Sequence, residues 1–149
     1  MRIAFDSNIM IYAEGSEDSP KRAIANALVD SIHADDLLIP IQAAGELRRW
    51  LVGKAKLSRQ EAVKRSELWI ARYPTQVTDK EVFLAAGELM VGHNLQVWDS
   101  VMLAAAWAGG ASVFLSEDLQ DGFKWRGVTV ANPFAEKPIK MVRDILGQH

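Results

Sequence analysis

The chain has 149 residues, a length that suits one domain with a single core and leaves little room for a second. It contains no cysteine, which excludes disulfide bonds and thiolate metal sites. Its formal net charge of −2 at pH 7 is close to neutral, so overall charge neither favours nor opposes a nucleic-acid partner.

Hydrophobic stretches give no sign of targeting. The N-terminal apolar run, residues 3–5, is too short for the hydrophobic region of a signal peptide. The longest apolar stretch, residues 101–115, is too short to span a bilayer. We therefore expect a cytoplasmic protein.

Four short apolar runs are predicted to be buried strands. They are rich in Val, Ile, Leu and Phe and do not alternate with polar residues, which is typical of strands covered on both faces. Longer helical patterns separate most of them, and this alternation predicts an α/β fold with a parallel sheet and helices on its faces. The predicted strands are residues 3–5, 37–41, 112–115 and 128–131.

Capping residues mark the start of several predicted helices. Ser19 stands before a proline, and Ser58 and Thr78 each have a glutamate three residues later, the spacing of a capping box. Asp99 is predicted to cap a helix that is almost entirely apolar and therefore largely buried. The predicted helices are residues 20–35, 42–54, 59–73, 79 to 92–94 and 100–108, with a short helix in the tail 136–149.

Two acidic residues follow predicted strands directly. Asp6 comes after the first strand and Asp118 lies in the loop after the third, and ligand sites of open parallel sheets lie at these carboxyl ends. Each also has a simpler interpretation. Asp6 could cap a helix that starts near Ser7, and Asp118 could belong to a solvated acidic turn with Glu117 and Asp121. Of these neighbours, Asp121 is interpreted as a turn residue before Gly122.

Two further acids lie on predicted helices. Asp99 stands at the start of the apolar helix, where the helix N-terminus favours a charged carboxylate whether or not it also binds a ligand. Glu46 lies on the helix after the second strand and could instead form a surface ion pair with Arg49. Several carboxylates sharing one cleft need a compensating cation, and oxygen ligands without cysteine favour Mg²⁺ or Mn²⁺. This chemistry predicts phosphodiester hydrolysis.

The pattern of these acids resembles the PIN-domain family over roughly residues 2–134. The matching features are a strand ending in Asp6-Ser7-Asn8, a glutamate on the helix after the second strand, an aspartate opening an Ala-rich helix, and Ser116 two residues before Asp118. The last strand, which runs into Asn132-Pro133-Phe134, also resembles bacterial members.

The resemblance implies a single PIN domain over residues 1–149, with a core of about 2–134 and a tail of 135–149. It implies a three-layer α/β/α sandwich and an Mg²⁺- or Mn²⁺-dependent endoribonuclease of the VapC toxin type. Such a protein is commonly a homodimer with an antitoxin partner. The implied catalytic and metal-binding residues are Asp6, Glu46, Asp99 and Asp118.

Other residues are weaker candidates for the same site. Asn8 and Ser116 could orient a ligand carboxylate or the attacking water, or could form local turn hydrogen bonds. Lys124 and Arg126 follow the acidic loop and could contact RNA. A basic cluster between residues 48 and 65 is a candidate for RNA backbone binding, for antitoxin contact, or for plain solvated helix surface.

Two other classes of α/β protein fit less well. A phosphatase of the haloacid dehalogenase type needs a second acid at the position of Asn8, and a signal-receiver domain needs an acidic pair after its first strand. The remaining alternative is a PIN fold that binds RNA or protein without cutting.

Overall fold

The computed structural model describes residues 1–148 and is built on a six-stranded sheet with strand order β3-β2-β1-β4-β6-β5. Neighbouring strands pair in parallel except β5, which runs antiparallel to β6 at one edge. The mostly parallel sheet predicted from the sequence is confirmed. Its strands are β1 (Ile3–Phe5), β2 (Leu37–Pro40), β3 (Thr75–Gln76), β4 (Val113–Leu115), β5 (Lys124–Trp125) and β6 (Val128–Ala131).

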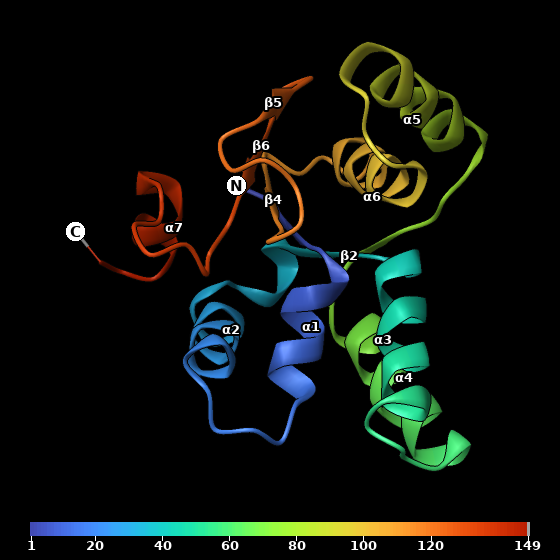
Figure 1. Cartoon of the computed structure of the whole chain (residues 1–149), viewed down its shortest axis with the longest axis vertical. Helices are drawn as coiled ribbons and strands as arrows, with labels where there is room; N and C mark the ends of the chain where they lie inside the picture. The colour runs from blue at the N-terminus through green and yellow to red at the C-terminus, as the bar shows by residue number, and fades with distance from the viewer. Residues whose placement is uncertain (149) are drawn as a thin grey trace.

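Helices cover both faces of this sheet, as expected for a three-layer sandwich. In Figure 1, one group of helices lies on one side of the sheet and a second group on the other. The first group is α1 (Ser7–Glu14), α2 (Pro20–Ser31), α3 (Ile41–Gly53) and α4 (Arg59–Arg72), and the second is α5 (Lys80–His93) and α6 (Val97–Ala108). A short 3₁₀ helix, η1 (Ala34–Asp36), precedes β2, and α7 (Lys140–Ile145) lies in the C-terminal tail, where a short helix was predicted.

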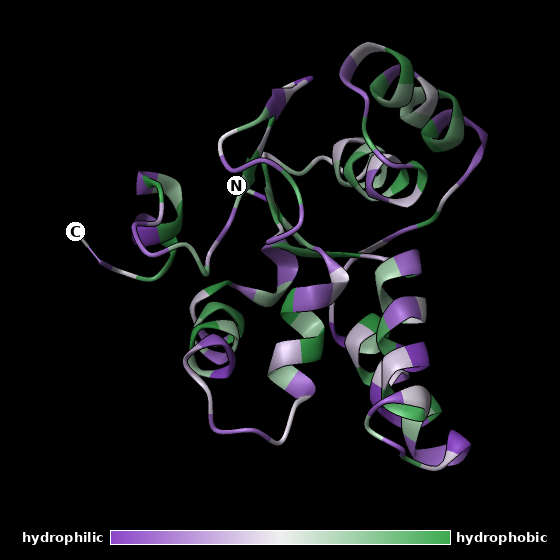
Figure 2. Cartoon of the chain, in the orientation of Figure 1, coloured by the Kyte–Doolittle hydropathy of each residue, from purple (hydrophilic) through white to green (hydrophobic). Residues whose placement is uncertain are grey.

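The core lies between the sheet and these helices. All residues of β1, β2, β4 and β6 are buried, and the strands stand out as hydrophobic in Figure 2. Seven consecutive residues of α6, from Ser100 to Ala106, are buried, which confirms the expectation from its apolar sequence. At the end of α6, a Cβ on Gly109 would stand 2.3 Å from a methyl carbon of Leu38. A larger residue at this position would require the Leu38 side chain to move.

Several element boundaries differ from the prediction. Strand β2 ends at Pro40, and Ile41 begins α3 because it emerges from the sheet edge into partial exposure. Helix α2 ends at Ser31, where the chain turns Ile32 into the core. The cap of α5 is Asp79, not Thr78, and its carboxylate accepts a hydrogen bond from the Val82 amide at 2.9 Å. The predicted caps Ser19 and Ser58 are confirmed.

Two short strands escaped prediction. Strand β3 has two residues, and β5 has two residues joined to β6 by a tight turn over Arg126 and Gly127. Both turn residues have positive φ, 46° and 82°, as a type I′ hairpin turn requires. Two residues are too few to show a hydrophobic periodicity, so strands of this length cannot be predicted from the sequence pattern.

Within residues 1–148, no helix is both long enough and apolar enough to cross a membrane.

Candidate active site

The order of the strands places the candidate site between β1 and β4. The chain moves from β1 to β2 on one side and later from β4 to β6 on the other, and ligands of parallel sheets bind in the crevice at such a reversal. Phe5 is in register with Leu115, so Asp6 and Ser116 leave the two strands side by side. The Asp6 amide donates to the Leu115 carbonyl oxygen at 2.9 Å.

Asp6 is buried, with 4% of its surface exposed. One carboxylate oxygen accepts a hydrogen bond from the Ser7 amide at 2.7 Å and thereby caps α1. The other accepts from the Ser116 hydroxyl at 2.6 Å. Asp6 therefore does cap a helix, as the simpler interpretation held, and it also points into the crevice between β1 and β4.

The surroundings of Asp6 disfavour its charge. Burial raises the pKa of this carboxyl to about 6, against the opposing effect of the hydrogen bonds from Ser116 and Ser7. The negative charges of Asp118 and Glu46 raise the pKa further. Two of the other predicted acids are thus close enough to Asp6 to disturb its ionisation.

Glu46 reaches the site from α3. Its carboxylate accepts a hydrogen bond from the Ser7 hydroxyl, which ties α3 to the start of α1. This contact replaces the ion pair with Arg49 that the sequence left open, since no such pair is formed in the described structure. Ser7 was not predicted as a site residue. Its position between Asp6 and Asn8, both of which were predicted site residues, could have indicated that Ser7 lies at the site.

Asp118 is exposed and lies in the loop after β4. The Asn8 side-chain amide donates to its carboxylate at 3.1 Å, and its own backbone amide donates to the Ser116 hydroxyl at 3.2 Å. The Ser116 hydroxyl therefore donates a hydrogen bond to Asp6 and accepts one from the Asp118 backbone amide. Both interpretations of Ser116, orienting an acid and forming a local turn, describe contacts that are present.

Asp99 completes the group from the other face of the sheet. It lies in the first turn of α6 but does not cap it, because the helix begins two residues earlier at Val97, after Gln96. The apolar run marked where the helix becomes buried, not where it starts. Burial raises the pKa of Asp99, and the charges of Asp118 and Glu46 raise it further.

The four acids therefore form one electrostatically coupled cluster of oxygen donors from four elements. Within residues 1–148, no three acidic or histidine side chains already stand close enough to ligate a single ion. Mg²⁺ is compatible with this spacing because it keeps several waters and needs only one or two direct carboxylates. The side-chain oxygen of Asn8 is buried without a protein partner in the described structure, and a water in the cluster would satisfy it. The residues fit a hard divalent cation.

The other acids of the loop after β4 are engaged elsewhere. Glu117 accepts hydrogen bonds from the Tyr12 hydroxyl and from Lys21, the latter at 2.9 Å. The Asp121 carboxylate accepts from the Asn132 amide at 2.9 Å, which agrees with its interpretation as a turn residue.

The two predicted RNA-binding cations after this loop lie away from the acids. In the β5–β6 pairing Lys124 stands opposite Thr129, and the turn with Arg126 lies at the amino-terminal end of β6. The acids lie at the carboxyl ends of the parallel strands. Arg126 pairs with Glu88 and stacks against two indole rings, with its guanidinium carbon 4.5 Å from the ring centre of Trp107 and 4.8 Å from that of Trp125.

The basic cluster of residues 48–65 is partly neutralised. Arg48 contacts Glu67 at 4.0 Å, and Arg65 contacts Glu14 at 3.7 Å and Glu61 at 3.2 Å. Both arginines thus have carboxylate partners within the protein.

Comparison with solved structures finds the same fold at low sequence identity. A toxin–antitoxin complex from Klebsiella pneumoniae is 16% identical, with a TM-score of 0.65 over 85% of this chain and 95% of that one. VapC20 from Mycobacterium tuberculosis, described as a Sarcin-Ricin loop cleaving toxin, is 14% identical, with a TM-score of 0.62 over 75% and 86%. VapBC2 from Rickettsia felis, bound to a promoter DNA fragment, is 14% identical, with a TM-score of 0.62 over 89% and 98%.

No curated protein matches the sequence. The family model of the PIN domain, however, matches residues 3–124, a span that starts at β1, includes all four acids and ends in β5. On this match over most of its length, the chain belongs to the PIN domain family.

Proposed function

We propose that this chain is a metal-dependent endoribonuclease that hydrolyses RNA phosphodiester bonds. The observation that supports this most is the convergence of four carboxylates on one crevice, where burial, and to a lesser extent the charges of Asp118 and Glu46, raise the pKa of Asp6 and Asp99. Gathering like charges costs stability, so the arrangement indicates a cationic ligand and a functional site. Membership of the PIN domain family, with a toxin described as Sarcin-Ricin loop cleaving among the solved structures of this fold, agrees with ribonuclease activity.

Asp6, Glu46, Asp99 and Asp118 would hold Mg²⁺ or Mn²⁺, directly or through water. The ion would stabilise charge on the scissile phosphate and lower the pKa of the attacking water. The protein's own contribution is to fix the acids. Ser116 holds Asp6, Ser7 holds Glu46, and Asn8 holds Asp118. These hydrogen bonds keep the acceptor oxygens oriented before the substrate arrives.

Incubation of purified protein with total cellular RNA tests this proposal. We expect discrete cuts in the presence of Mg²⁺ or Mn²⁺ and none when EDTA is added. End mapping of the products would identify the target sequence. RNA binding without cleavage in either metal would support the non-catalytic binding module instead.

We further propose that the protein is the toxin of a type II toxin–antitoxin pair. The structures of similar fold include toxin–antitoxin complexes. A groove of about 550 Å³ between α1 and α3 is a suitable place for an antitoxin segment. Its lining combines apolar side chains such as Trp50 and Leu51 with Arg22, whose buried Nε has no partner in the described structure. An apolar segment with a carboxylate would satisfy both features.

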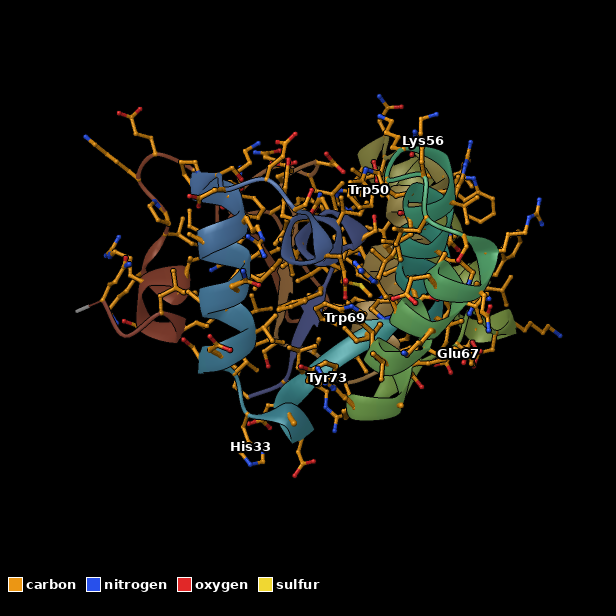
Figure 3. All side chains as sticks on the ribbon, turned by 90° about the horizontal axis from the view of Figure 1, so that it is seen from below. His33, Trp50, Lys56, Glu67, Trp69 and Tyr73 are labelled. Carbon is orange, nitrogen blue, oxygen red and sulfur yellow. The ribbon has the colours of Figure 1, made fainter. Side chains whose placement is uncertain are left out.

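A second, smaller cavity of about 190 Å³ adjoins this groove, since Glu14 lines both. It includes Trp69 and Tyr73, whose ring centres lie 5.7 Å apart. Trp50, which is labelled with Trp69 and Tyr73 in Figure 3, lines the larger groove. A partner helix that spans both cavities would contact Trp50 and Tyr73.

A homodimer is proposed on the basis of α5. Four large apolar residues, Phe83, Leu84, Met90 and Val91, share the outer face of this helix with Gly87. Their exposed fractions reach 63%, 64% and 91% for Phe83, Leu84 and Val91. A continuous apolar stripe of this kind is typical of a protein–protein contact, and a second copy would present the same face.

Replacing Leu84 with glutamate is expected to convert the dimer to a monomer, because it places charge at the centre of the apolar stripe. Light scattering after gel filtration measures the change. Leu68→Glu is the matched control, since Leu68 is exposed on α4 on the other side of the sheet. A monomeric unsubstituted protein, or equal dissociation by both variants, would contradict this use of α5.

A further inference from the structure

A shallow hollow of about 580 Å³ lies beside the acidic cluster and is not used by the roles proposed above. It is bounded by α3 and by the segment between β3 and α5. Its lining residues are Ile41, Gln42, Gly45, Glu46, Arg49 and Thr78. The hollow is open to solvent, so a ligand there would lie along the surface of α3, and its extent is comparable with that of one nucleotide.

The hollow is continuous with the site because Glu46 belongs to both. The charge of Glu46 acts on Asp6 and Asp99, and the same residue lines the hollow. Gln42, Gly45, Glu46 and Arg49 follow the spacing i, i+3, i+4 and i+7, so they form one face of α3. A ligand in the hollow therefore lies along α3, and one end of it reaches the acids.

Arg49 supplies the positive charge that the acidic cluster lacks. It is exposed and has no ion-pair partner within residues 1–148, in contrast to Arg48 and Arg65. Glu46, one turn away, is held by Ser7 and does not neutralise it. A free guanidinium beside a phosphodiester-cleaving site is suited to bind the neighbouring phosphate of the strand.

The remaining lining suits a nucleoside better than a protein helix. Ile41 is partly exposed and offers an apolar surface for a base or ribose, while Gln42 and Thr78 offer hydrogen-bonding groups. Gly45 leaves the floor flat, since a Cβ there would meet no atom within 4 Å.

We propose that this hollow binds one nucleotide of the RNA strand next to the scissile phosphate, with Arg49 on its phosphate and Gln42 on its base edge. This inference rests on the proposed ribonuclease function and assigns it a substrate subsite. Arg49 and the lining of the hollow then contribute to substrate affinity and sequence preference, while the acids carry the reaction.

Two substitutions test the subsite by different physical means. Arg49→Gln removes the charge, and Gly45→Leu fills the hollow without removing any contact. Because Gly45 lies inside α3 with open space at its Cβ, Gly45→Leu is expected to preserve or raise thermal stability. The matched controls are Lys137→Gln, which removes an exposed charge in the C-terminal tail, and Gly53→Leu, which fills open space at the end of α3.

Binding is measured with a fluorescent single-stranded RNA oligonucleotide that contains the mapped cleavage site, or with a mixed-sequence oligonucleotide if no cut is found. The measurement uses the Asp6→Asn background so that it does not depend on cleavage. Arg49→Gln should weaken binding about tenfold, a typical effect of losing a charge-assisted contact. Gly45→Leu should weaken binding by about the same factor because the leucine side chain occupies the space proposed for the nucleotide. In otherwise unsubstituted enzyme they should raise KM with kcat within about twofold.

Equal binding by both variants and both controls would overturn the subsite. So would loss of a co-purified antitoxin without loss of RNA affinity, which would assign the hollow to the protein partner. If Arg49→Gln and Gly45→Leu weaken RNA binding but neither the unsubstituted protein nor any variant cuts RNA, the subsite stands and the ribonuclease proposal fails.

Discussion

Replacing Asp6 with asparagine is expected to reduce the rate of RNA cleavage by on the order of 10³-fold or more, because the reaction loses a central carboxylate. Asparagine keeps the size of the side chain and an oxygen that accepts from the Ser7 amide, so α1 keeps its cap. The substitution therefore removes the negative charge of Asp6 and little else. Asp99→Asn and Asp118→Asn should have effects of the same kind, because both acids belong to the same coupled cluster. Initial rates of cutting of a defined RNA in Mg²⁺ or Mn²⁺ measure the loss.

Asp121→Asn is the matched control for this prediction. Asp121 lies three residues after Asp118 in the same loop, but its carboxylate accepts from the Asn132 amide. Asparagine can make the same contact, so cleavage should stay within about twofold of the unsubstituted rate. Full activity in Asp6→Asn, or equal losses in Asp121→Asn and Asp118→Asn, would refute the assignment of the acids.

The acids after strands were the most predictable part of the site. Asp6 and Asp118 follow apolar runs directly, and adjacent parallel strands bring their carboxyl ends together whatever the details of packing. Glu46 was identified through the resemblance to the family. Its orientation depends on Ser7, a contact across 39 positions of the chain that no local pattern encodes.

Errors arose where tertiary contacts override local signals. Asp99 was taken as a helix cap because the apolar run starts after it, but Val97 and Trp98 extend the helix into solvent. Arg126 was assigned to RNA because it follows the acidic loop in sequence. A two-residue antiparallel strand instead carries it to the other end of β6, where Glu88 and two tryptophans hold it.

The fold positions the acids at a cost to its own stability. Burial of the Asp6 carboxyl is the largest contribution to its raised pKa, and the charges of Asp118, in the loop after β4, and of Glu46, on α3, add to it. An uncharged Asp6 would suit the isolated protein better. The raised pKa therefore reflects a site organised for a ligand that is not part of the polypeptide.

The stability of the metal-free protein is expected to depend on pH through Asp6. The Asp6 pKa is about 6 in the folded state and 3.8 in an unstructured chain. As pH rises through this interval, the unfolded chain loses its proton first, so the free energy of unfolding decreases and the loss is complete above pH 6. The shift corresponds to about 3 kcal/mol for this one carboxyl. Asp99 contributes in the same direction because its pKa is also raised.

The difference between the unsubstituted protein and Asp6→Asn isolates this contribution, since most other groups titrate alike in both. Denaturant unfolding in EDTA should show Asp6→Asn gaining stability relative to the unsubstituted protein between pH 3.8 and about 6, by about 3 kcal/mol in total. Asp121→Asn should show no such trend. Mn²⁺ at neutral pH should stabilise the unsubstituted protein much more than Asp6→Asn, because a cation bound at the cluster offsets the repulsion that the substitution has already removed. A pH-independent difference would mean that Asp6 is not under electrostatic stress, and the case for a cation at this crevice would then lose its physical basis.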